Sequence, residues 1–280
     1  MKTDNELKQI VKEKYSEIAL QSKTENESSC CGSGGCSTEV YNIMTDDYTQ
    51  IKGYYSEADL GLGCGLPTQF AKIKAGDVVI DLGSGAGNDC FIARKEAGST
   101  GKIIGIDFTE AMINKARTNA ERIGYENVQF RQGDIEQMPV NDNVADVVVS
   151  NCVLNLVPNK NNVFKEIYRV LKPNAHFSIS DIVLVGNLPN SLKEVAEMYA
   201  GCVTGAIQKQ DYLNMIEQNG FIKITIQKEK IIHVPDDILI RYVSKNEIEQ
   251  FRESGVGIFS ITVYAEKPTE KSCCGSECCS

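Results

Sequence analysis

A glycine-rich turn between an apolar run and a helical pattern constrains this chain more than any other feature. Residues 77–80 read Asp-Val-Val-Ile, a short β-branched run that is typical of a buried strand. The turn DLGSGAGN follows at 81–88, and an apolar helical pattern begins at Phe91. Glycines in such a turn let the chain bend tightly and let a ligand approach the backbone. The pattern predicts a strand–loop–helix unit of an α/β fold with a ligand at the loop.

Three later strands are predicted to end in polar residues. Residues 102–106 end in Asp107, residues 128–130 precede Gly-Asp-Ile at 133–135, and residues 145–152 end in Ser-Asn-Cys. An acidic residue about 20 positions after the glycines is expected to bind ribose hydroxyls, and Asp134 can accept the adenine amino group. The expected cofactor-binding residues are Asp81, Gly83, Gly85, Gly87, Asp107, Phe108, Asp134, Ile135 and Asn151.

The order of loop, acid, acid and strand end resembles that of the class I S-adenosylmethionine-dependent methyltransferases. The resemblance implies a doubly wound, Rossmann-like α/β sheet with S-adenosylmethionine as the methyl donor. The loop is GxGxG rather than the GxGxxG of dinucleotide-binding domains. A nicotinamide-binding domain is the alternative interpretation of the same elements.

The alternation of strands and helices predicts how the chain is divided. We expect an N-terminal helix and thiol-bearing loop at 1–70, the donor-binding sheet at 71–185, an α+β part completing the sheet at 186–268, and a cysteine-rich tail at 269–280. Helices are predicted at 4–20, 110–123, 163–171, 191–200 and 209–219. The last strands are predicted at 174–184, 221–232 and 257–266, the final two closing the sheet in antiparallel fashion.

Composition narrows the classes of partner. The net charge of −9 argues against nucleic acid, because phosphate contacts need clustered Lys and Arg. The N-terminal residues lack the apolar core of a signal peptide, and no apolar run reaches the length of a membrane span. We therefore expect a cytoplasmic protein without a membrane partner, whose 11 cysteines serve thiol or metal chemistry rather than a disulfide framework.

The cysteine settings extend the resemblance. The run SNCVLNLVPNKNNVFKEIYRVLKP, the segment LGLGCGLP and the segment GCVTGA resemble the arsenite methyltransferase family over about residues 15–268. In that family four cysteines handle arsenic, and the resemblance places them at Cys36, Cys64, Cys152 and Cys202. Cys152 and Cys202 are the usual metalloid ligands, with Cys64 as the third. Cys36 is chosen over its neighbours Cys30 and Cys31 because its separation from Cys64 resembles the family's.

Two departures from the family pattern are visible. Asn174-Ala175 stands where the family usually has Gly-Gly, which we expect to alter a turn. Gly61-Leu62 stands where many members have an aromatic residue, so a cofactor role for Tyr54 or Tyr55 is in doubt. Cys64 itself lies between two glycines, which predicts a flexible and accessible loop.

The resemblance implies a reaction as well as a substrate. Three thiolates hold soft trivalent arsenic, whose lone pair attacks the donor's methyl group, and methylated arsenicals are further substrates. No general base is needed, because the nucleophile has no proton to lose. Methylation formally oxidises the arsenic, so a disulfide, with Cys36 and Cys64 as the expected pair, returns two electrons, and glutathione or thioredoxin reduces it.

Two other functions compete with arsenic detoxification. One is a class I methyltransferase of a small organic molecule, such as a quinone precursor, in which Cys152 and Cys202 are dispensable. The other is a metalloid-sequestering protein without enzymatic activity that binds through its terminal cysteines. The tail KSCCGSECCS at 271–280 suits zinc, copper(I) or arsenite binding and equally suits a flexible tail without a role.

Overall fold

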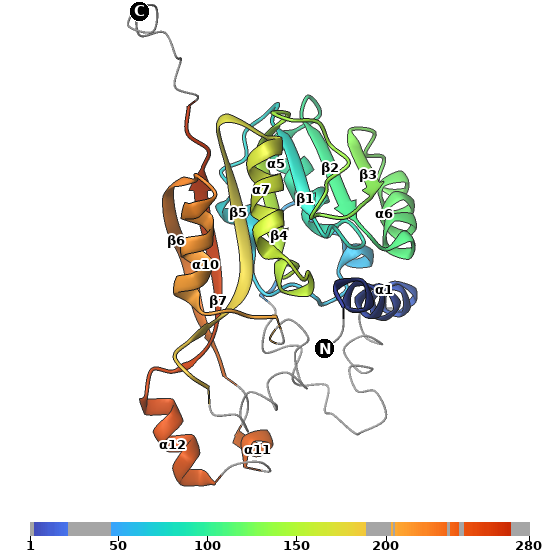
Figure 1. Ribbon diagram of the computed structural model, residues 1–280. Helices are drawn as coiled ribbons and strands as arrows, with labels where there is room; N and C mark the ends of the chain where they lie inside the picture. Colours follow the sequence, from blue (N-terminus) through green and yellow to red (C-terminus); the bar gives the residue numbers. More distant parts are fainter. Residues whose placement is uncertain are drawn as a thin grey trace, which may run out of the picture.

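The computed structural model describes residues 3–21, 46–188, 203, 205–233, 236–240 and 244–269 (Figure 1). Within these ranges one sheet of seven strands has the order β3-β2-β1-β4-β5-β7-β6. Neighbours from β3 to β5 are parallel, whereas β7 is antiparallel to both β5 and β6. The strands are β1 (Val78–Leu82), β2 (Lys102–Asp107), β3 (Val128–Gln132), β4 (Ala145–Asn151), β5 (Leu171–Val185), β6 (Ile222–Ile232) and β7 (Gly257–Glu266). The predicted sheet and its antiparallel closure are confirmed.

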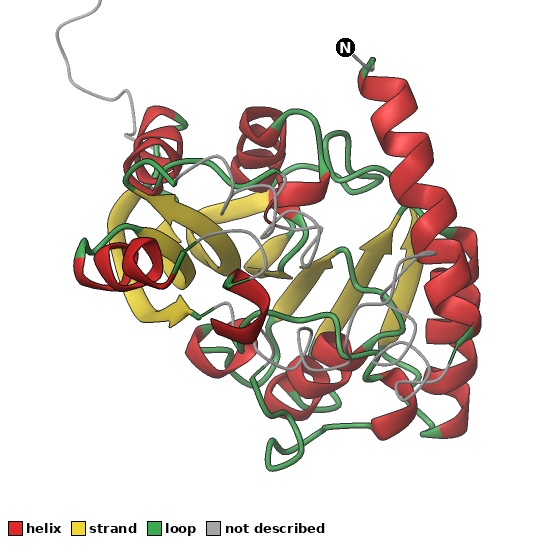
Figure 2. Ribbon diagram, turned by 90° about the horizontal axis from the view of Figure 1, so that it is seen from below, coloured by secondary structure: helices red, strands yellow, loops and turns green. Residues whose placement is uncertain are grey.

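Helices cover both faces of this sheet (Figure 2). Ile80 and Leu82 of β1 pack in one buried cluster with α7 (Lys160–Val170) and α10 (Lys209–Gln218). Val79, which alternates with them, packs in a second cluster with α5 (Asn88–Ala97) and α6 (Glu110–Arg122). Side chains alternate between the faces of a strand, so a continuous apolar run is what a strand covered on both sides requires. The fold is therefore doubly wound, and its strand order reverses between β1 and β4.

The N-terminal helix α1 (Asp4–Leu20) lies beside α6 at one edge of the molecule (Figure 1). It starts with a capping box, in which Thr3 and Glu6 satisfy each other's backbone N–H groups. At its other end the Lys115 ammonium of α6 donates to the carbonyl oxygens of Ala19 and Gln21, each at 3.0 Å. These contacts seat the helix near the carboxyl ends of the strands.

The predicted boundaries differ from the structure mainly around β5. Helix α7 starts three residues before the expected position, and β5 follows it without a loop. Asn174, where the chain departs from the family pattern, adopts a φ of +64°, a left-handed conformation that Asn tolerates better than most residues. The short helices α4 (Pro67–Phe70), α11 (Asp236–Leu239) and α12 (Lys245–Glu253) were not predicted. The helix predicted at 191–200 lies outside the described residues.

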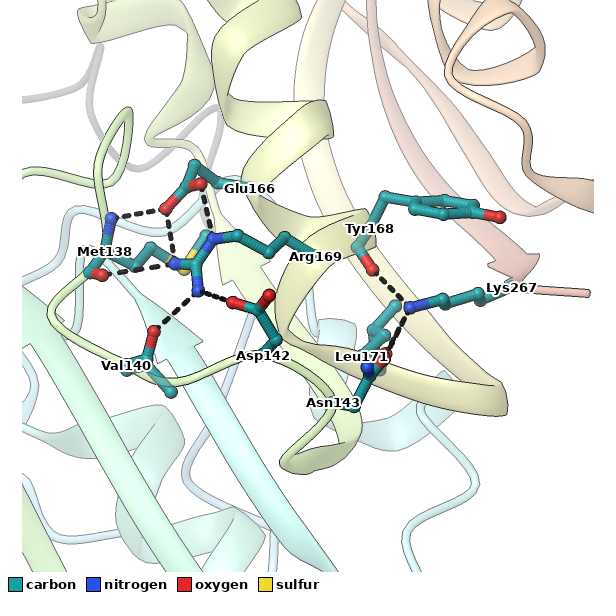
Figure 3. Close-up of polar contacts among 9 residues, drawn as sticks. All are labelled: Met138, Val140, Asp142, Asn143, Glu166, Tyr168, Arg169, Leu171 and Lys267. Carbon is teal, nitrogen blue, oxygen red and sulfur yellow. Dashed lines mark hydrogen bonds and ion pairs between the residues drawn. The ribbon is translucent and has the colours of Figure 1, made fainter. Parts of the chain in front are cut away.

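Two cations join α7 to the loops around it (Figure 3). Arg169 pairs with Glu166 and Asp142 and donates to the carbonyls of Met138 and Val140. Lys267, which is only 6% exposed, donates to the carbonyl oxygens of Tyr168 and Leu171 at 2.9 and 2.8 Å, and to Asn143. The end of β7 is thereby fixed to the end of α7.

In the described ranges no helix has the length and apolarity that crossing a bilayer requires.

Candidate functional site

A cavity open to solvent lies where the sheet order reverses, at the carboxyl ends of the parallel strands. This is the position at which open α/β sheets bind their ligands. Loops after four strands contribute to its wall, and α1 adds Lys8 and Tyr15. The expected cofactor residues that line it are Asp81, Gly83, Gly85, Asp107, Phe108, Asp134, Ile135 and Asn151. Gly87 does not line the cavity; it caps α5.

The glycine loop is fixed to the next strand. Gly83, Gly85 and Gly87 all have positive φ, which disfavours side chains at these positions. The N–H of Gly85 donates to Asp107 Oδ2 at 3.1 Å, while the other oxygen accepts from the Thr109 N–H at 2.8 Å. Burial raises the pKa of Asp107, and these two hydrogen bonds partly oppose that shift. Because a carboxylate offers about four lone pairs, Asp107 retains capacity for hydroxyl donors in the cavity.

The inner end of the cavity is acidic. Asp81 is 2% exposed, and burial together with the neighbouring charge of Asp89 raises its pKa well above the usual range. Burial also raises the pKa of Asp89 to about 6, although hydrogen bonds from Asn151, Tyr48 and Thr68 oppose the shift. Buried carboxylates gain most from a cation placed beside them. A ligand that carries positive charge fits this end of the cavity.

A buried hydroxyl indicates a second property of a ligand that would fit the cavity. In the described part of the chain, Ser84 Oγ lines the cavity and has no hydrogen-bond partner. Buried polar atoms of folded proteins are normally paired. The cavity is therefore suited to a ligand with polar groups of its own as well as a positive charge.

Two thiols from distant parts of the sequence belong to one buried cluster that reaches the cavity at Cys152. Cys152 is 5% exposed, lines the cavity and directly follows β4. Its φ is +61°, which is uncommon for a residue other than glycine, and its N–H donates to the Ser180 carbonyl at 2.8 Å. Cys64 is 1% exposed and belongs to the same buried cluster. Val203, the residue after Cys202 in the sequence, also belongs to this cluster.

Comparison with known proteins decides the family. A methyltransferase-domain family model matches residues 73–220. The arsenite methyltransferase of Halobacterium salinarum is 37% identical over 94% of this chain and 67% of its own length. The chain belongs to the arsenite methyltransferase family. The arsenite methyltransferase of Aquipseudomonas alcaligenes is 30% identical over 80% of this chain and 65% of its own length. The chain thus spans about two thirds of the length of these relatives.

A solved structure supports the same assignment. An arsenic(III) S-adenosylmethionine methyltransferase from Chlamydomonas reinhardtii superposes with a TM-score of 0.62 at 29% identity. The match covers 83% of this chain and 74% of that chain. It therefore extends well beyond the donor-binding sheet that methyltransferases share.

The four cysteines that the arsenite methyltransferase family implies are only partly described. Cys64 and Cys152 are placed as above, whereas Cys36, Cys202 and the cysteines at 273–279 lie outside the described residues. Among the residues that are described, no three His, Cys, Asp or Glu side chains form a metal-binding group.

Cys64 departs from its expected environment. Its neighbouring glycines predicted a flexible, accessible loop, but the thiol is buried and the backbone is hydrogen-bonded on both sides. The glycines serve close packing instead, as a Cβ on Gly65 would lie 2.5 Å from Ser180 Oγ. The accessible-loop prediction is wrong.

The carboxylate expected to accept the adenine amino group has a partner that the sequence did not reveal. Lys8 Nζ lies 2.6 Å from Asp134 Oδ2 and 3.4 Å from Glu136. Burial lowers the pKa of Lys8, but its carboxylate partners more than reverse that effect and leave it raised. Helix α1 is therefore tied to the wall of the cavity where the adenine is expected.

Sequence reasoning also missed a polar group behind the thiols. Tyr212 and Asp181 are fully buried, with the hydroxyl 3.4 Å from Asp181 Oδ2. Burial raises the pKa of Tyr212 well above its usual range, and the charges of Asp181, Cys64 and Cys152 add to the shift. Burial likewise raises the pKa of Asp181 to about 7, against the opposing charge of Lys160. Nothing local in the sequence marks this pair. Asp181 lies on β5 and Tyr212 on α10, and only the packing of the two elements brings them together.

The remaining thiol and histidines have structural roles. Cys90 is fully buried and its Sγ lies 3.2 Å from Asp81 Oδ2, and burial raises its pKa well above the usual range. Cys90 is thus a packed residue of the interior. His176 Nε2 lies 2.6 Å from the Ala71 carbonyl, and exposed His233 contacts Arg252.

Proposed function

We propose that this chain transfers methyl groups from S-adenosylmethionine to trivalent arsenic held by Cys64, Cys152 and Cys202. The observation that carries the proposal is the position of Cys152, a buried thiol at a strand end that lines the donor cavity and shares a cluster with Cys64. A methyltransferase of carbon, nitrogen or oxygen has no need of two thiols there. The chain's membership of the arsenite methyltransferase family also supports trivalent arsenic as the substrate.

The cavity fits the proposed donor. Bound S-adenosylmethionine supplies an electrophilic methyl group on a sulfonium cation. Asp107 offers lone pairs to ribose hydroxyls, Phe108 and Ile135 offer apolar contact to the base, and Asp81 and Asp89 offer negative charge to the cationic end. The carboxylates thus favour a charged donor over the neutral product that remains after transfer.

The thiols would prepare the nucleophile. Arsenous acid exchanges its three hydroxides for three thiolates, and each thiol proton leaves with a hydroxide as water. The arsenic keeps its lone pair, so no side chain has to remove a proton in the transfer step. The chain contributes the alignment of lone pair and methyl group, which is the main source of rate in such displacements.

A second methylation requires trivalent arsenic again. We propose that a thiolate that is not an arsenic ligand attacks the sulfur of one ligand cysteine. The S–S bond forms as the As–S bond breaks, and the electron pair of that bond returns the pentavalent arsenic to the trivalent state. Cys36 and Cys64 are the proposed pair, and an external thiol, from glutathione or thioredoxin, reduces that disulfide by exchange. Methylated arsenicals then re-enter as substrates.

The test is an arsenic speciation assay on the purified chain. The protein is incubated with arsenite, S-adenosylmethionine and a thiol reductant, and arsenic species are separated by chromatography with elemental detection. Cys152→Ser is the test variant, and Cys90→Ala is the matched control, since Cys90 is buried but outside the thiol cluster. We expect methylated arsenic from the parent and the control and none from Cys152→Ser.

Other outcomes identify the competing functions. No methylated arsenic from a folded parent that binds the donor would overturn the proposal and favour an organic substrate. Tight arsenite binding that truncation at residue 270 abolishes, again without methyl transfer, would favour sequestration by the tail.

A further inference from the structure

The segment that carries Cys64 is held between Asn151 at the end of β4 and Ser180 within β5. A Cβ on Gly63 would lie 2.7 Å from Asn151 Nδ2, and one on Gly65 would lie 2.5 Å from Ser180 Oγ. Both distances are shorter than real Cβ contacts allow. The two glycines therefore let the loop 63–65 press directly against Asn151 and Ser180.

Asn151 binds this loop with both ends of its amide. Its Oδ1 accepts from the Cys64 N–H at 3.0 Å, and its Nδ2 donates to the Gly65 carbonyl at 2.9 Å. The orientation of the amide is fixed, because an N–H needs an acceptor and a carbonyl needs a donor. The Asn151 side chain thereby bonds the backbone on both sides of the Cys64 side chain. The residue that follows Asn151 in the sequence is the second thiol, Cys152.

Two further side chains hold the amide in place. Asn151 Nδ2 also donates to the Tyr48 hydroxyl and, at 3.2 Å, to Asp89 Oδ2. Tyr48 lies 3.0 Å from both the Gly65 carbonyl and Asp89 Oδ2. Asp89 also accepts from Thr68 Oγ1 at 3.3 Å, just beyond the loop. The loop is therefore linked to the first turn of α5, which follows the glycine turn of the donor cavity.

We propose that Asn151, oriented by Tyr48 and Asp89, is a positioning residue that fixes the Cys64 thiol relative to the donor cavity. The inference rests on the proposed function and assigns Asn151 a task beyond the cofactor contact expected from the sequence. The network connects the first turn of α5 to Cys64, one of the proposed arsenic ligands. Asn151 also directly precedes Cys152, another proposed ligand, in the sequence. Loss of the network frees Cys64 while leaving the glycine loop and Asp107 as they are.

Tyr48 brings an aromatic side chain to this loop from outside it. The chain lacks the aromatic residue that many members carry directly before this loop. Tyr48 is 6% exposed, lines the cavity and reaches the Gly65 carbonyl from a separate segment. An aromatic hydroxyl therefore contacts this loop from a different place in the sequence.

The test compares Tyr48→Phe and Asn151→Ala with a matched control in the full-length chain. Tyr264→Phe is the control, because it removes a hydroxyl that donates to Glu266 at 2.8 Å, away from the cavity. The rate at which iodoacetamide alkylates Cys64 is measured by mass spectrometry under native conditions. Cys90, which is fully buried on α5, is followed in the same sample as a reporter of general unfolding.

We expect Tyr48→Phe to raise the alkylation rate of Cys64 about tenfold, since each lost hydrogen bond eases local opening. The rate at Cys90 stays unchanged, and Tyr264→Phe leaves both rates at the parent level. In the arsenic assay, Tyr48→Phe lowers kcat about 10- to 100-fold while KM for the donor stays within about twofold, as expected for misalignment rather than lost binding. Asn151→Ala gives the same or larger rise at Cys64.

Two results would overturn the inference. Equal acceleration at Cys64 and Cys90 would mean that Tyr48 supports the fold as a whole. No acceleration at Cys64 in either variant would mean that the network does not hold the loop. If the parent transfers no methyl group to arsenite, the proposed function fails, and the alkylation rates still decide whether Asn151 anchors Cys64.

Discussion

Lys8 of the N-terminal helix lies with its Nζ 2.6 Å from Asp134 Oδ2, across 126 positions of sequence. The side chains of Lys8 and Asp134 are 29% and 39% exposed, so solvent screens this ion pair in part. With Tyr15, Lys8 makes α1 one wall of the donor cavity. The pair therefore couples donor retention to the seating of α1.

Replacing Lys8 with Met should weaken donor binding. We expect the dissociation constant of S-adenosylmethionine to rise about two- to fivefold, which is the range for a partly exposed ion pair. The affinity of the parent should fall with added salt more steeply than that of the variant. Calorimetric titration at two salt concentrations measures both, and Lys14→Met, an exposed change on the same helix, should match the parent. An unchanged affinity in Lys8→Met would show that α1 does not contribute to the cavity.

Replacing Asp89 with Asn should change how stability depends on pH. The Asp89 carboxyl titrates at about 6 in the folded chain and near 3.8 when unfolded, so the folded state binds more protons between these values. The free energy of unfolding of the parent therefore falls as pH rises through this window. Asn carries no charge to bury, so the variant should gain on the order of 2–3 kcal/mol relative to the parent between pH 4 and 6.

Urea unfolding at several pH values measures this difference. A constant difference between parent and Asp89→Asn across the window would contradict the raised pKa. Methyl transfer should fall in the variant even where its stability is greater, because the amide cannot accept hydrogen bonds from Asn151, Tyr48 and Thr68 at both oxygens.

Replacing Lys267 with Met should destabilise the fold. The change leaves the carbonyls of Tyr168 and Leu171 without their buried donor (Figure 3). We expect a loss of about 2–4 kcal/mol in the free energy of unfolding. Lys223→Met removes an exposed ion pair with Glu266 and should change stability by less than about 0.5 kcal/mol. Similar losses in the two variants would refute a special role for the buried lysine.

Replacing Cys64 or Cys152 with glycine should change the stability of the fold by different amounts. Cys152 has a φ of +61°, whereas Cys64 is not among the residues with positive φ. Cys152→Gly relieves backbone strain of about 1 kcal/mol, which offsets part of the lost packing. Cys64→Gly has no such relief, so it should be the less stable variant in urea unfolding. The reverse order would argue against strain at Cys152.

Local patterns predicted β1, β2 and β4 because a signal of its own marks the end of each. The glycine turn after β1, Asp107 at the end of β2 and Cys152 after β4 all follow apolar runs, and parallel strand ends necessarily meet at one edge. The start of β5 was missed because α7 passes into it at Leu171 without a turn residue.

The supporting contacts of the site were not predictable in the same way. Lys8 with Asp134, Tyr48 with Asn151, and Tyr212 with Asp181 are pairs separated by at least 31 positions. Only the packing of α1 and α10 and of the loop around Tyr48 brings them together, and no periodic pattern encodes those contacts. Asp89 was the one partner with a local signal, since it stands in the first turn of the helix that follows the glycine turn.

X-ray absorption at the arsenic edge, on the full chain loaded with one equivalent of arsenite, tests the central claim most directly. The proposed function predicts arsenic bound by three sulfur atoms, with one sulfur lost in Cys152→Ser and in Cys202→Ser, and no change on removal of residues 271–280. Arsenic that keeps its three sulfurs in Cys152→Ser but loses them with the tail would contradict the claim.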